Sequence, residues 1–424
     1  MQKPDLSVEV DGVKFKNPVI VGASDMTTTL RGIKRCAESG AGGVVMKTLS
    51  TQALPRTRTC PFMFSLERLG KGLNTGPFGG SEAYGVNLPE VWLKEVGSEA
   101  VKVCHDAGVK FIASMAVQMG DNKQDLLDLA RRIEEIEPDI FQVPCYVCPN
   151  QVSVPKAEAL LGSESELLMA IREVVGVPVS VKINVVVYPQ LFTERCLGYE
   201  KAGASHISLM IGPVGIAVDA ENENFIGPPL LNAMVTGRAG IPEMSARIVE
   251  AKQSGVKSSI CPSGGIWQWN DAVGYMLLGA NTVEVVSLIY NRGTGALGQI
   301  VNGIEDWMMR KGYHSVDEFV GRMLPRVCNL EDVVPEVYPV PSPITPIIDY
   351  ELCNLCGLCV DSCVYECLER VDKVRGEVFM DKSHCWGCGL CVLRCPKAAV
   401  KLVDSAGVVH MDGSGLVKLW LPSK

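Results

Sequence analysis

The sequence predicts an α/β protein, a (β/α)8 barrel followed by a small cysteine-rich domain. Two observations predict this order. Over about residues 17–315, eight short runs rich in β-branched residues alternate with amphipathic stretches, which is the pattern of a parallel barrel. Closer to the C-terminus, eight of the 17 cysteines repeat one spacing twice. A doubly wound open sheet is the alternative for the first part, because it is built from the same alternation.

Each barrel strand is predicted from a short apolar run and each helix from an amphipathic stretch. The predicted strands are Pro18–Ala23, Gly43–Lys47, Lys110–Val117, Asp139–Pro144, Val177–Asn184, Ser205–Ile211, Ser258–Ser263 and Thr282–Ile289. The predicted helices are Leu30–Ser39, Lys123–Ile136, Glu164–Val174, Leu191–Ala202, Met244–Ser254, Asn270–Leu278 and Gly298–Lys311.

The chain divides into four predicted parts. Residues 1–315 form the barrel, and residues 316–346 form a connector whose prolines between Pro335 and Pro346 make it semi-rigid. Residues 347–402 form the cysteine-rich domain, and residues 403–424 form a tail that packs on one of the domains or frays. A length of 424 residues, of which 47% are hydrophobic, accommodates a barrel of about 250 residues and a second domain.

Composition excludes several classes of partner. The net charge of −8 and the lack of a basic run argue against nucleic acid. The polar stretch from Met1 to Glu9 does not resemble a signal peptide, and no uncharged apolar stretch is long enough for a membrane span. Free thiols fit a reducing compartment, as do the oxygen-sensitive iron–sulfur clusters that the cysteine spacing described next predicts. We therefore expect a cytoplasmic protein.

The repeated C-x2-C-x2-C-x3-C spacing predicts two 4Fe-4S clusters and therefore transfer of single electrons. In two-cluster ferredoxins the fourth cysteine of each run ligates the other cluster. The expected ligand sets are Cys353, Cys356, Cys359 and Cys395 for one cluster, and Cys385, Cys388, Cys391 and Cys363 for the other. A zinc site or a disulfide scaffold is the alternative, but zinc ribbons use pairs of C-x2-C. Val364 stands where this motif has proline, which affects packing and not ligation.

Two lysines in the barrel strands suggest an anionic ligand. Lys47 and Thr48 end the second strand, and Lys182 lies inside the fifth. A charged lysine in an apolar strand is costly unless it meets an anionic partner. A reduced flavin, negatively charged at its N1–C2=O edge, is such a partner. A solvent-facing or ion-paired lysine is the alternative.

Glycines near the last two strands suggest a phosphate site. Gly264 and Gly265 follow the seventh strand and Ser287 ends the eighth, where barrels often bind phosphate through backbone N–H groups. Ordinary tight turns are the alternative. The stretch Gly293–Gly298 matches G-x-G-x-x-G but follows the last strand, which favours a helix start beside a flavin phosphate over a dinucleotide-binding unit.

Cys148 follows the fourth strand, and an exposed thiol there can act as a general acid. A small buried hydrophobic side chain is the alternative role for a single cysteine.

Taken in order, these features resemble the dihydroorotate dehydrogenase-like superfamily. They are Asn17-Pro18, Lys47-Thr48, Cys148-Pro149-Asn150, Lys182, Gly264-Gly265 and the terminal cluster domain. Over about residues 5–402 the sequence is most similar to the FMN and iron–sulfur portion of the NAD-dependent dihydropyrimidine dehydrogenases.

The resemblance implies FMN on top of the barrel and assigns roles to individual residues. Gly264, Gly265 and Ser287 would bind the phosphate, Lys182 would face the N1 side of the ring, and Lys47 with Thr48 would face the ring or the substrate. Ala23 and Ser24 would lie under the flavin. Cys148 would protonate one carbon of a substrate C=C bond, and Asn87 and Asn150 would hold the substrate ring.

Two departures concern the substrate. The family has asparagine where Cys145 stands, and an Asn-Thr or Asn-Ser pair where Ile211-Gly212-Pro213 stands. Those groups bond the amide edge of a pyrimidine, and a site without them recognises that edge poorly. A less polar enone, enoyl or cyclic substrate becomes an alternative.

The sequence therefore predicts an FMN- and iron–sulfur-dependent oxidoreductase acting on an activated C=C or CH–CH bond. No NAD(P)-binding fold is visible, so we expect a hetero-oligomer with an FAD- and NAD(P)H-binding flavoprotein subunit, or a ferredoxin as partner. An electron-relay subunit of a larger redox complex, with no substrate of its own, is the alternative function. A barrel that has lost its flavin is a third reading.

Overall fold

A computed structural model describes most of the chain as two compact units, Met1–Val327 and Cys328–Lys424. The described residues are 3–51, 63–65, 78–80, 88–117, 121–144, 163–186, 189–213, 215–226, 234–328, 341–415 and 417. Each unit is considered separately below.

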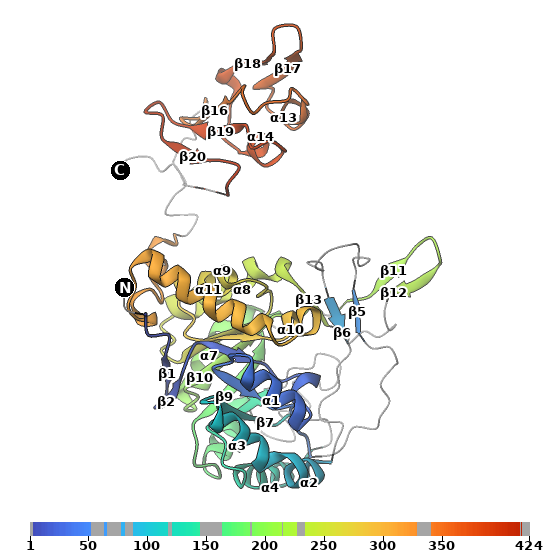
Figure 1. Ribbon diagram of the computed structural model, residues 1–424, viewed down its shortest axis with the longest axis vertical. Coiled ribbons are helices and arrows are strands. Elements are labelled where there is room, and N and C mark those ends of the chain that lie inside the picture. The colour runs from blue at the N-terminus through green and yellow to red at the C-terminus, as the bar shows by residue number, and fades with distance from the viewer. Residues whose placement is uncertain are drawn as a thin grey trace. The chain divides into compact units, whose positions relative to one another are not determined.

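The first unit contains a closed barrel of eight parallel strands, which confirms the predicted fold and excludes an open sheet (Figure 1). Around the barrel the strand order is β10-β14-β15-β3-β4-β7-β8-β9. The strands are β3 (Val19–Val21), β4 (Gly43–Val45), β7 (Lys110–Ser114), β8 (Ile140–Pro144), β9 (Val179–Asn184), β10 (His206–Met210), β14 (Ser259–Ser263) and β15 (Val283–Val285). Each of them lies within one of the eight predicted runs.

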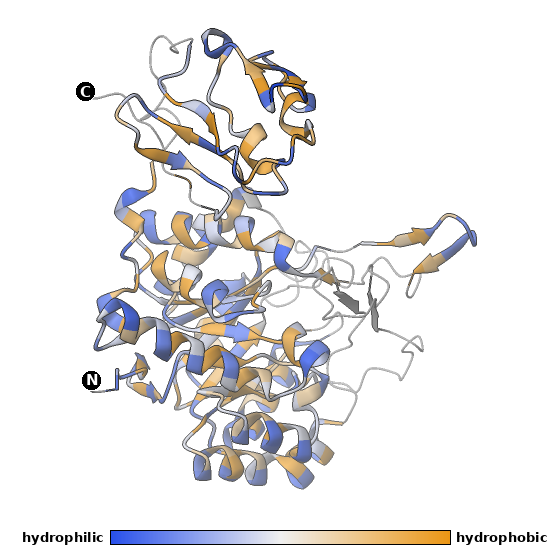
Figure 2. Cartoon of the chain, turned by 45° about the horizontal axis from the view of Figure 1, so that its top comes forward, coloured by the Kyte–Doolittle hydropathy of each residue, from blue (hydrophilic) through white to orange (hydrophobic). Residues whose placement is uncertain are grey.

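Helices follow the strands and cover the barrel. They are α1 (Leu30–Glu38), α2 (Pro89–Trp92), η2 (Leu93–Gly97), α3 (Ser98–Asp106), α4 (Lys123–Glu134), α6 (Glu164–Arg172), η3 (Pro189–Leu191), α7 (Phe192–Lys201), α8 (Ile241–Gln253), α9 (Trp269–Leu277), α10 (Ser287–Arg292) and α11 (Ala296–Lys311). Figure 2 shows hydrophobic and hydrophilic residues alternating along these helices, as expected for helices with one buried face. The segment from α2 to α3 was not among the predicted helices. It contains the π-helical turn η2, which interrupts the usual helical spacing of apolar residues.

The predicted end of the eighth strand is wrong. β15 ends at Val285, and Ser287 is the first residue of the short helix α10 rather than the last residue of a strand. Ser287, Leu288 and Ile289 are all buried. The buried start of a short helix has the same apolar sequence as a buried strand, so periodicity does not separate the two.

Asn17, which precedes the first barrel strand, ties that strand to the end of α1. Its Oδ1 accepts a hydrogen bond from the Val19 N–H at 3.0 Å, and its Nδ2 donates to the Gly40 carbonyl at 3.0 Å. The side chain is 4% exposed. Both polar ends of a buried amide are therefore satisfied, as burial requires.

Two long loops meet in a small sheet outside the barrel. β5 (Met63–Ser65) and β6 (Phe78–Gly80) belong to the loop after β4, and β13 (Met234–Thr236) belongs to the loop after β10. They form one antiparallel sheet in the order β13-β6-β5. The hairpin of β11 (Ala217–Asp219) and β12 (Asn224–Ile226) projects from the second of these loops (Figure 1). A further hairpin, β1 (Val8–Val10) with β2 (Val13–Phe15), precedes the barrel.

The second unit has two small antiparallel sheets and two single-turn helices. The sheets are β16 (Thr345–Ile348) with β19 (Val400–Val403) and β20 (Val409–Met411), and β17 (Leu368–Asp372) with β18 (Glu377–Met380). The helices are α13 (Leu358–Asp361) and α14 (Leu390–Leu393). β20 lies within the stretch expected to be a tail, and residues 316–327, expected in the connector, are part of the first unit.

Among the described residues, no helix combines the length and apolar character needed to cross a membrane.

We expect Gly303→Ala to destabilise the barrel by about 1–3 kcal/mol, because α11 packs too closely on α9 for a methyl group. A Cβ at Gly303 would lie 2.3 Å from Cγ of the Trp269 indole. Gly274→Ala on α9 is the matched control, since a Cβ there meets nothing within 4 Å. The control should gain about 0.5–1 kcal/mol from helix propensity. Thermal unfolding of both variants checks this, and equal melting temperatures would contradict it.

Candidate active site

An open cavity of about 730 Å³ lies at the carboxyl ends of the strands on one side of the barrel. Active sites of (β/α)8 barrels lie at this end. Five residues expected at a cofactor site line it: Ala23, Lys182, Gly264, Gly265 and Ser287. Ile211, at a position expected to face the substrate, also lines it. The other lining residues were not predicted as site residues: Met210, Met234, Thr236, Ser263, Ile266, Glu284, Val285, Val286 and Tyr290.

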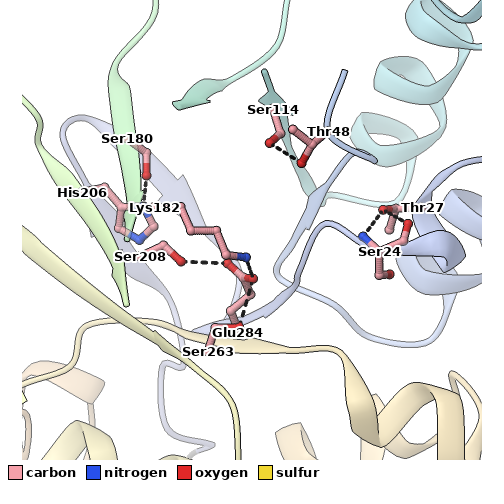
Figure 3. Close-up of polar contacts among 10 residues, drawn as sticks. All are labelled: Ser24, Thr27, Thr48, Ser114, Ser180, Lys182, His206, Ser208, Ser263 and Glu284. Atoms are coloured by element: carbon pink, nitrogen blue, oxygen red, sulfur yellow. Dashed lines mark hydrogen bonds and ion pairs between the residues drawn. The ribbon is translucent and has the colours of Figure 1, made fainter. Parts of the chain in front are cut away.

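A buried ion pair lines the cavity, and Figure 3 shows its contacts. Lys182 Nζ, from β9, contacts Glu284 Oε1, from β15. Ser208 Oγ donates to Glu284 Oε2 at 3.0 Å, and Ser263 Oγ donates to Oε1 at 3.1 Å. The residues Lys182 and Glu284 are 8% and 1% exposed. Lys182 is thus both ion-paired and part of the cavity wall. Lys182 was predicted as a site residue because it is a charged residue in an apolar strand. Glu284 has the same property, so the same signal could have identified it.

Gly22 provides the space for this carboxylate. A Cβ at Gly22 would lie 2.2 Å from Glu284 Oε1 and 2.7 Å from Val286 Cγ2. No side chain fits at that distance without displacing the carboxylate. The β3 backbone therefore approaches the ion pair directly.

Two glycines of the turn after β14 line the cavity. Gly264 and Gly265 have φ of +127° and +76°, values that glycine adopts without strain. The Tyr275 hydroxyl donates to the Gly264 carbonyl at 3.0 Å, which fixes the turn from α9. Within the described part of the chain, neither glycine N–H has an acceptor. Such paired N–H groups form an anion-binding concavity.

The other residues expected at the cofactor lie near the first two strands. Lys47 Nζ lies 3.1 Å from Asp25 Oδ1, and Thr48 Oγ1 bonds Ser114 Oγ at 2.9 Å. Neither Lys47 nor Thr48 is among the described residues that line the cavity. Ser24 follows Ala23 in the chain, and its buried Oγ has no hydrogen-bond partner among the described residues.

Apart from the ion pair, apolar side chains line much of the cavity. Ile211 packs against the turn after β14, with its Cγ2 2.6 Å from the position of a Cβ on Gly264. Met210 and Met234 also line the cavity. The Gly212 carbonyl accepts from Asn184 Nδ2 at 3.1 Å, so it is already bonded within the barrel. Among the described residues that line the cavity, these side chains offer a ligand van der Waals contact, and none of the lining residues carries a side-chain amide.

Asn87, Cys145, Cys148 and Asn150 lie outside the described residues.

A second polar layer fills the barrel near β9 and β10. His206 Nδ1 bonds Ser180 Oγ at 2.9 Å, and Nε2 bonds Thr282 Oγ1 at 3.1 Å (Figure 3 shows the first bond). His206 is 1% exposed. Burial lowers the pKa of His206 from 6.5 to about 4, although the nearby Glu284 charge acts to raise it. His206 is therefore neutral at pH 7.

The two four-cysteine loops of the second unit have the same backbone conformation. In the first, Leu355 and Gly357 have φ of 56° and 82°; in the second, Gly387 and Gly389 have φ of 66° and 84°. The last of each pair precedes a single-turn helix, α13 or α14. The two copies of the spacing therefore fold as two copies of one loop.

Four cysteine sulfurs accept backbone hydrogen bonds in a matching pattern. The bonds run from Leu355 N to Cys353 Sγ (3.4 Å), from Gly387 N to Cys385 Sγ (3.4 Å), from Leu368 N to Cys363 Sγ (3.4 Å) and from Ala399 N to Cys395 Sγ (3.2 Å). In iron–sulfur proteins, N–H donors to the ligating sulfurs tune the reduction potential.

The sulfurs form two groups that each draw on both loops. Burial raises the pKa of Cys359, and its neighbours Cys353 and Cys395 add to the effect, against a backbone hydrogen bond at Val360. The grouping of Cys359 with Cys395 joins the end of the second loop to the first.

Burial likewise raises the pKa of Cys391 to about 12, and Cys388, Cys385 and Cys363 contribute further. A bound cation offsets the cost of such crowded, buried thiolates. No three His, Cys, Asp or Glu side chains in the described regions could hold a single metal ion. In a cubane each thiolate binds its own iron, so the four sulfurs surround the cluster instead of meeting at one point.

Two known families match this chain. The family described as dihydroorotate dehydrogenase matches residues 5–308, and the family described as a 4Fe-4S dicluster domain matches residues 352–399.

Curated relatives span most of the chain. This chain is 28% identical over 335 residues to the dihydroorotate dehydrogenase B (NAD(+)) catalytic subunit of Pyrococcus abyssi. The match covers 75% of this chain and 99% of the relative. The subunit of the same name from Methanosarcina mazei is 30% identical over 331 residues, 74% of this chain and 94% of the relative. The NAD-dependent dihydropyrimidine dehydrogenase subunit PreA of Escherichia coli (strain K12) is 25% identical over 395 residues, 88% of this chain and 90% of the relative.

We expect the buried His206 to make the protein less stable as the pH falls from 7 to 4. The unfolded chain takes up a proton near pH 6.5, and the folded chain only near pH 4. Stability is therefore complete above pH 6.5 and decreases by about 3 kcal/mol on acidification through this window.

Chemical unfolding of wild type and His206→Asn, followed by circular dichroism between pH 7 and 5, measures this contribution. The variant should show a shallower pH dependence. His314→Asn, at an exposed histidine of the same unit, is the control and should retain the wild-type slope. Identical slopes in all three proteins would rule out the assignment.

Proposed function

The chain belongs to the dihydroorotate dehydrogenase family, and on this premise we propose that it is an oxidoreductase that uses FMN and two 4Fe-4S clusters. The proposed reaction is reduction of an activated C=C bond, or the reverse oxidation of a CH–CH bond. Electrons would pass between the barrel and a partner through the clusters. The observation that carries the proposal is the cavity at the carboxyl ends of the strands, with Lys182 and the Gly264–Gly265 turn in its wall.

The residues around the cavity fit FMN. The lining combines apolar side chains with a few polar groups, as is typical of cofactor sites. Gly264, Gly265 and Ser287 would hold the phosphate, and Lys182 would face the N1 side of the ring. The buried Ser24 Oγ, without a partner among the described residues, would gain one from a group bound beside Ala23.

In the proposed reaction, this chain supplies the proton. FMN, when bound, supplies a hydride and hence both electrons to one carbon of the C=C bond. Cys148 would hold the proton that adds to the other carbon, and its thiolate would then take a proton from water. Lys47, oriented by Asp25, would face the ring or the substrate, and Asn87 and Asn150 would hold the substrate in place.

The substrate class follows from the cavity wall. Ile211 offers no hydrogen bond where a pyrimidine presents its amide edge, and the Gly212 carbonyl is bonded to Asn184. We therefore propose a substrate whose C=C bond is activated by a carbonyl group and which has fewer polar edges than a pyrimidine. The relative from Escherichia coli is named as a dihydropyrimidine dehydrogenase subunit, so uracil is the comparison substrate.

A partner must exchange electrons with the clusters. The relatives are named as subunits of NAD-dependent enzymes. We propose a hetero-oligomer in the cytoplasm with a flavoprotein subunit that binds FAD and NAD(P)H, or an exchange with free ferredoxin.

An electron-relay subunit without its own substrate is the second candidate. The apolar Ile211 in the cavity lining supports it, because it stands where the family has an asparagine that binds the substrate. A stable complex in which no small molecule reoxidises the FMN would favour this candidate over the enzyme.

We expect Cys148→Ala and Cys148→Ser to lose turnover by about 10²–10⁴-fold, the usual contribution of a general acid. Flavin reduction by an artificial donor should remain, because it needs no proton from Cys148. Cys196→Ala, at a buried cysteine on α7, controls for loss of a thiol elsewhere. Anaerobic assays with cyclohexenone and uracil measure turnover. Intact turnover in both Cys148 variants would contradict the role of Cys148 as the general acid.

We expect about eight iron atoms per chain after anaerobic purification, since each cluster holds four. Cys356→Ala, which removes an exposed cysteine of the first loop, should leave about four. Cys367→Ala, outside the repeated spacing, should leave about eight. Iron and sulfide analysis with electron paramagnetic resonance checks these counts. Full iron content in Cys356→Ala would contradict the ligand assignment.

A further inference from the structure

The cavity contains one positive and one negative side chain, and these are bonded to each other. Of the described residues that line it, only Lys182 and Glu284 carry charge. Within the described part of the chain, Glu284 is also the only acceptor for Lys182 Nζ. The positive charge that an anionic ligand would meet in this cavity is therefore already compensated.

Glu284 is held in place independently of Lys182. Each of its carboxylate oxygens accepts a serine hydroxyl, from Ser208 on β10 and from Ser263 on β14. The missing side chain at Gly22 leaves the space that Oε1 occupies. A carboxylate fixed by three strands is a permanent feature of the site and not a counter-ion that a ligand displaces.

This fixed charge bears on the redox balance of a group bound above it. Reduction adds negative charge to a flavin, which a nearby ammonium group favours and a nearby carboxylate opposes. With both present in a buried site, the two effects cancel in large part. A lysine without this partner would stabilise the reduced form much more strongly.

We propose that Glu284 is a positioning residue that fixes the Lys182 ammonium group at the cavity wall and cancels its charge, and so keeps the reduction potential of bound FMN low. This inference rests on the proposed function, because it requires FMN in the cavity. A low potential suits a flavin that passes electrons to or from iron–sulfur clusters, many of which have low potentials.

Glu284→Gln tests the charge while retaining the shape. The glutamine keeps an acceptor for the serine hydroxyls but no charge. Anaerobic redox titration of the FMN absorbance should show a shift to higher potential of at least about 30 mV. This shift corresponds to a tenfold stronger preference for reduced over oxidised FMN in a two-electron couple. Lys182→Met should shift the potential in the opposite direction, and Lys182→Met/Glu284→Gln should lie close to wild type.

Thermal unfolding of the same variants separates this role from a structural one. Each single variant leaves one buried charge unpaired and should melt below wild type, whereas the double variant should recover most of the loss. If Glu284→Gln does not retain FMN, Glu284→Asp, which keeps the charge and withdraws it by one methylene, should give a smaller shift in the same direction.

The outcomes distinguish the role of Glu284 from the proposed function. An FMN-loaded Glu284→Gln protein with the wild-type potential would overturn the role of Glu284 and leave the proposed function intact. A wild-type protein without FMN absorbance would overturn the proposed function and, with it, the effect on potential. The melting temperatures would then still report whether the two charges compensate each other.

Discussion

Closure of eight parallel strands into one barrel is the constraint on which the candidate site depends. It brings the carboxyl ends of β9, β10, β14 and β15 together, although long stretches of sequence separate them. Lys182 and Glu284 are 102 residues apart in the chain and adjacent in space. In a doubly wound open sheet the first strand lies in the interior and the last at an edge, so the strand that bears Glu284 would not meet the Gly22 backbone that follows β3.

The polar interior on this side of the barrel is unusual, because such barrels are mostly filled by branched aliphatic side chains. Two layers replace them here: the Lys182–Glu284 pair with its serines, and His206 with Ser180 and Thr282. Each layer satisfies its own hydrogen bonds, so burial costs less than the composition suggests. The interior is thus part of the site's electrostatics as well as of the core.

Local sequence patterns predicted the features that are local. The eight strands were found because each is a short β-branched run, and the cluster domain because its spacing is repeated. The boundary at Ser287 was misread because the buried start of a short helix has a strand's composition. The sheet of β5, β6 and β13 was missed because it pairs segments from two different loops. Glu284 was overlooked although it stands in an apolar strand as Lys182 does, and the roles of Cys148, Asn87 and Asn150 remain predictions.

The contact between Gly22 and Glu284 has a consequence for how this sequence can evolve. The space taken by one side chain exists only because the other position has none. The two positions are therefore epistatic: a larger residue at 22 is tolerated only with a shorter one at 284, and that exchange would withdraw or remove the counter-ion of Lys182. Among related sequences, the residue that faces the lysine can then be inferred from the residue at position 22, so the pair indicates how the cavity is charged.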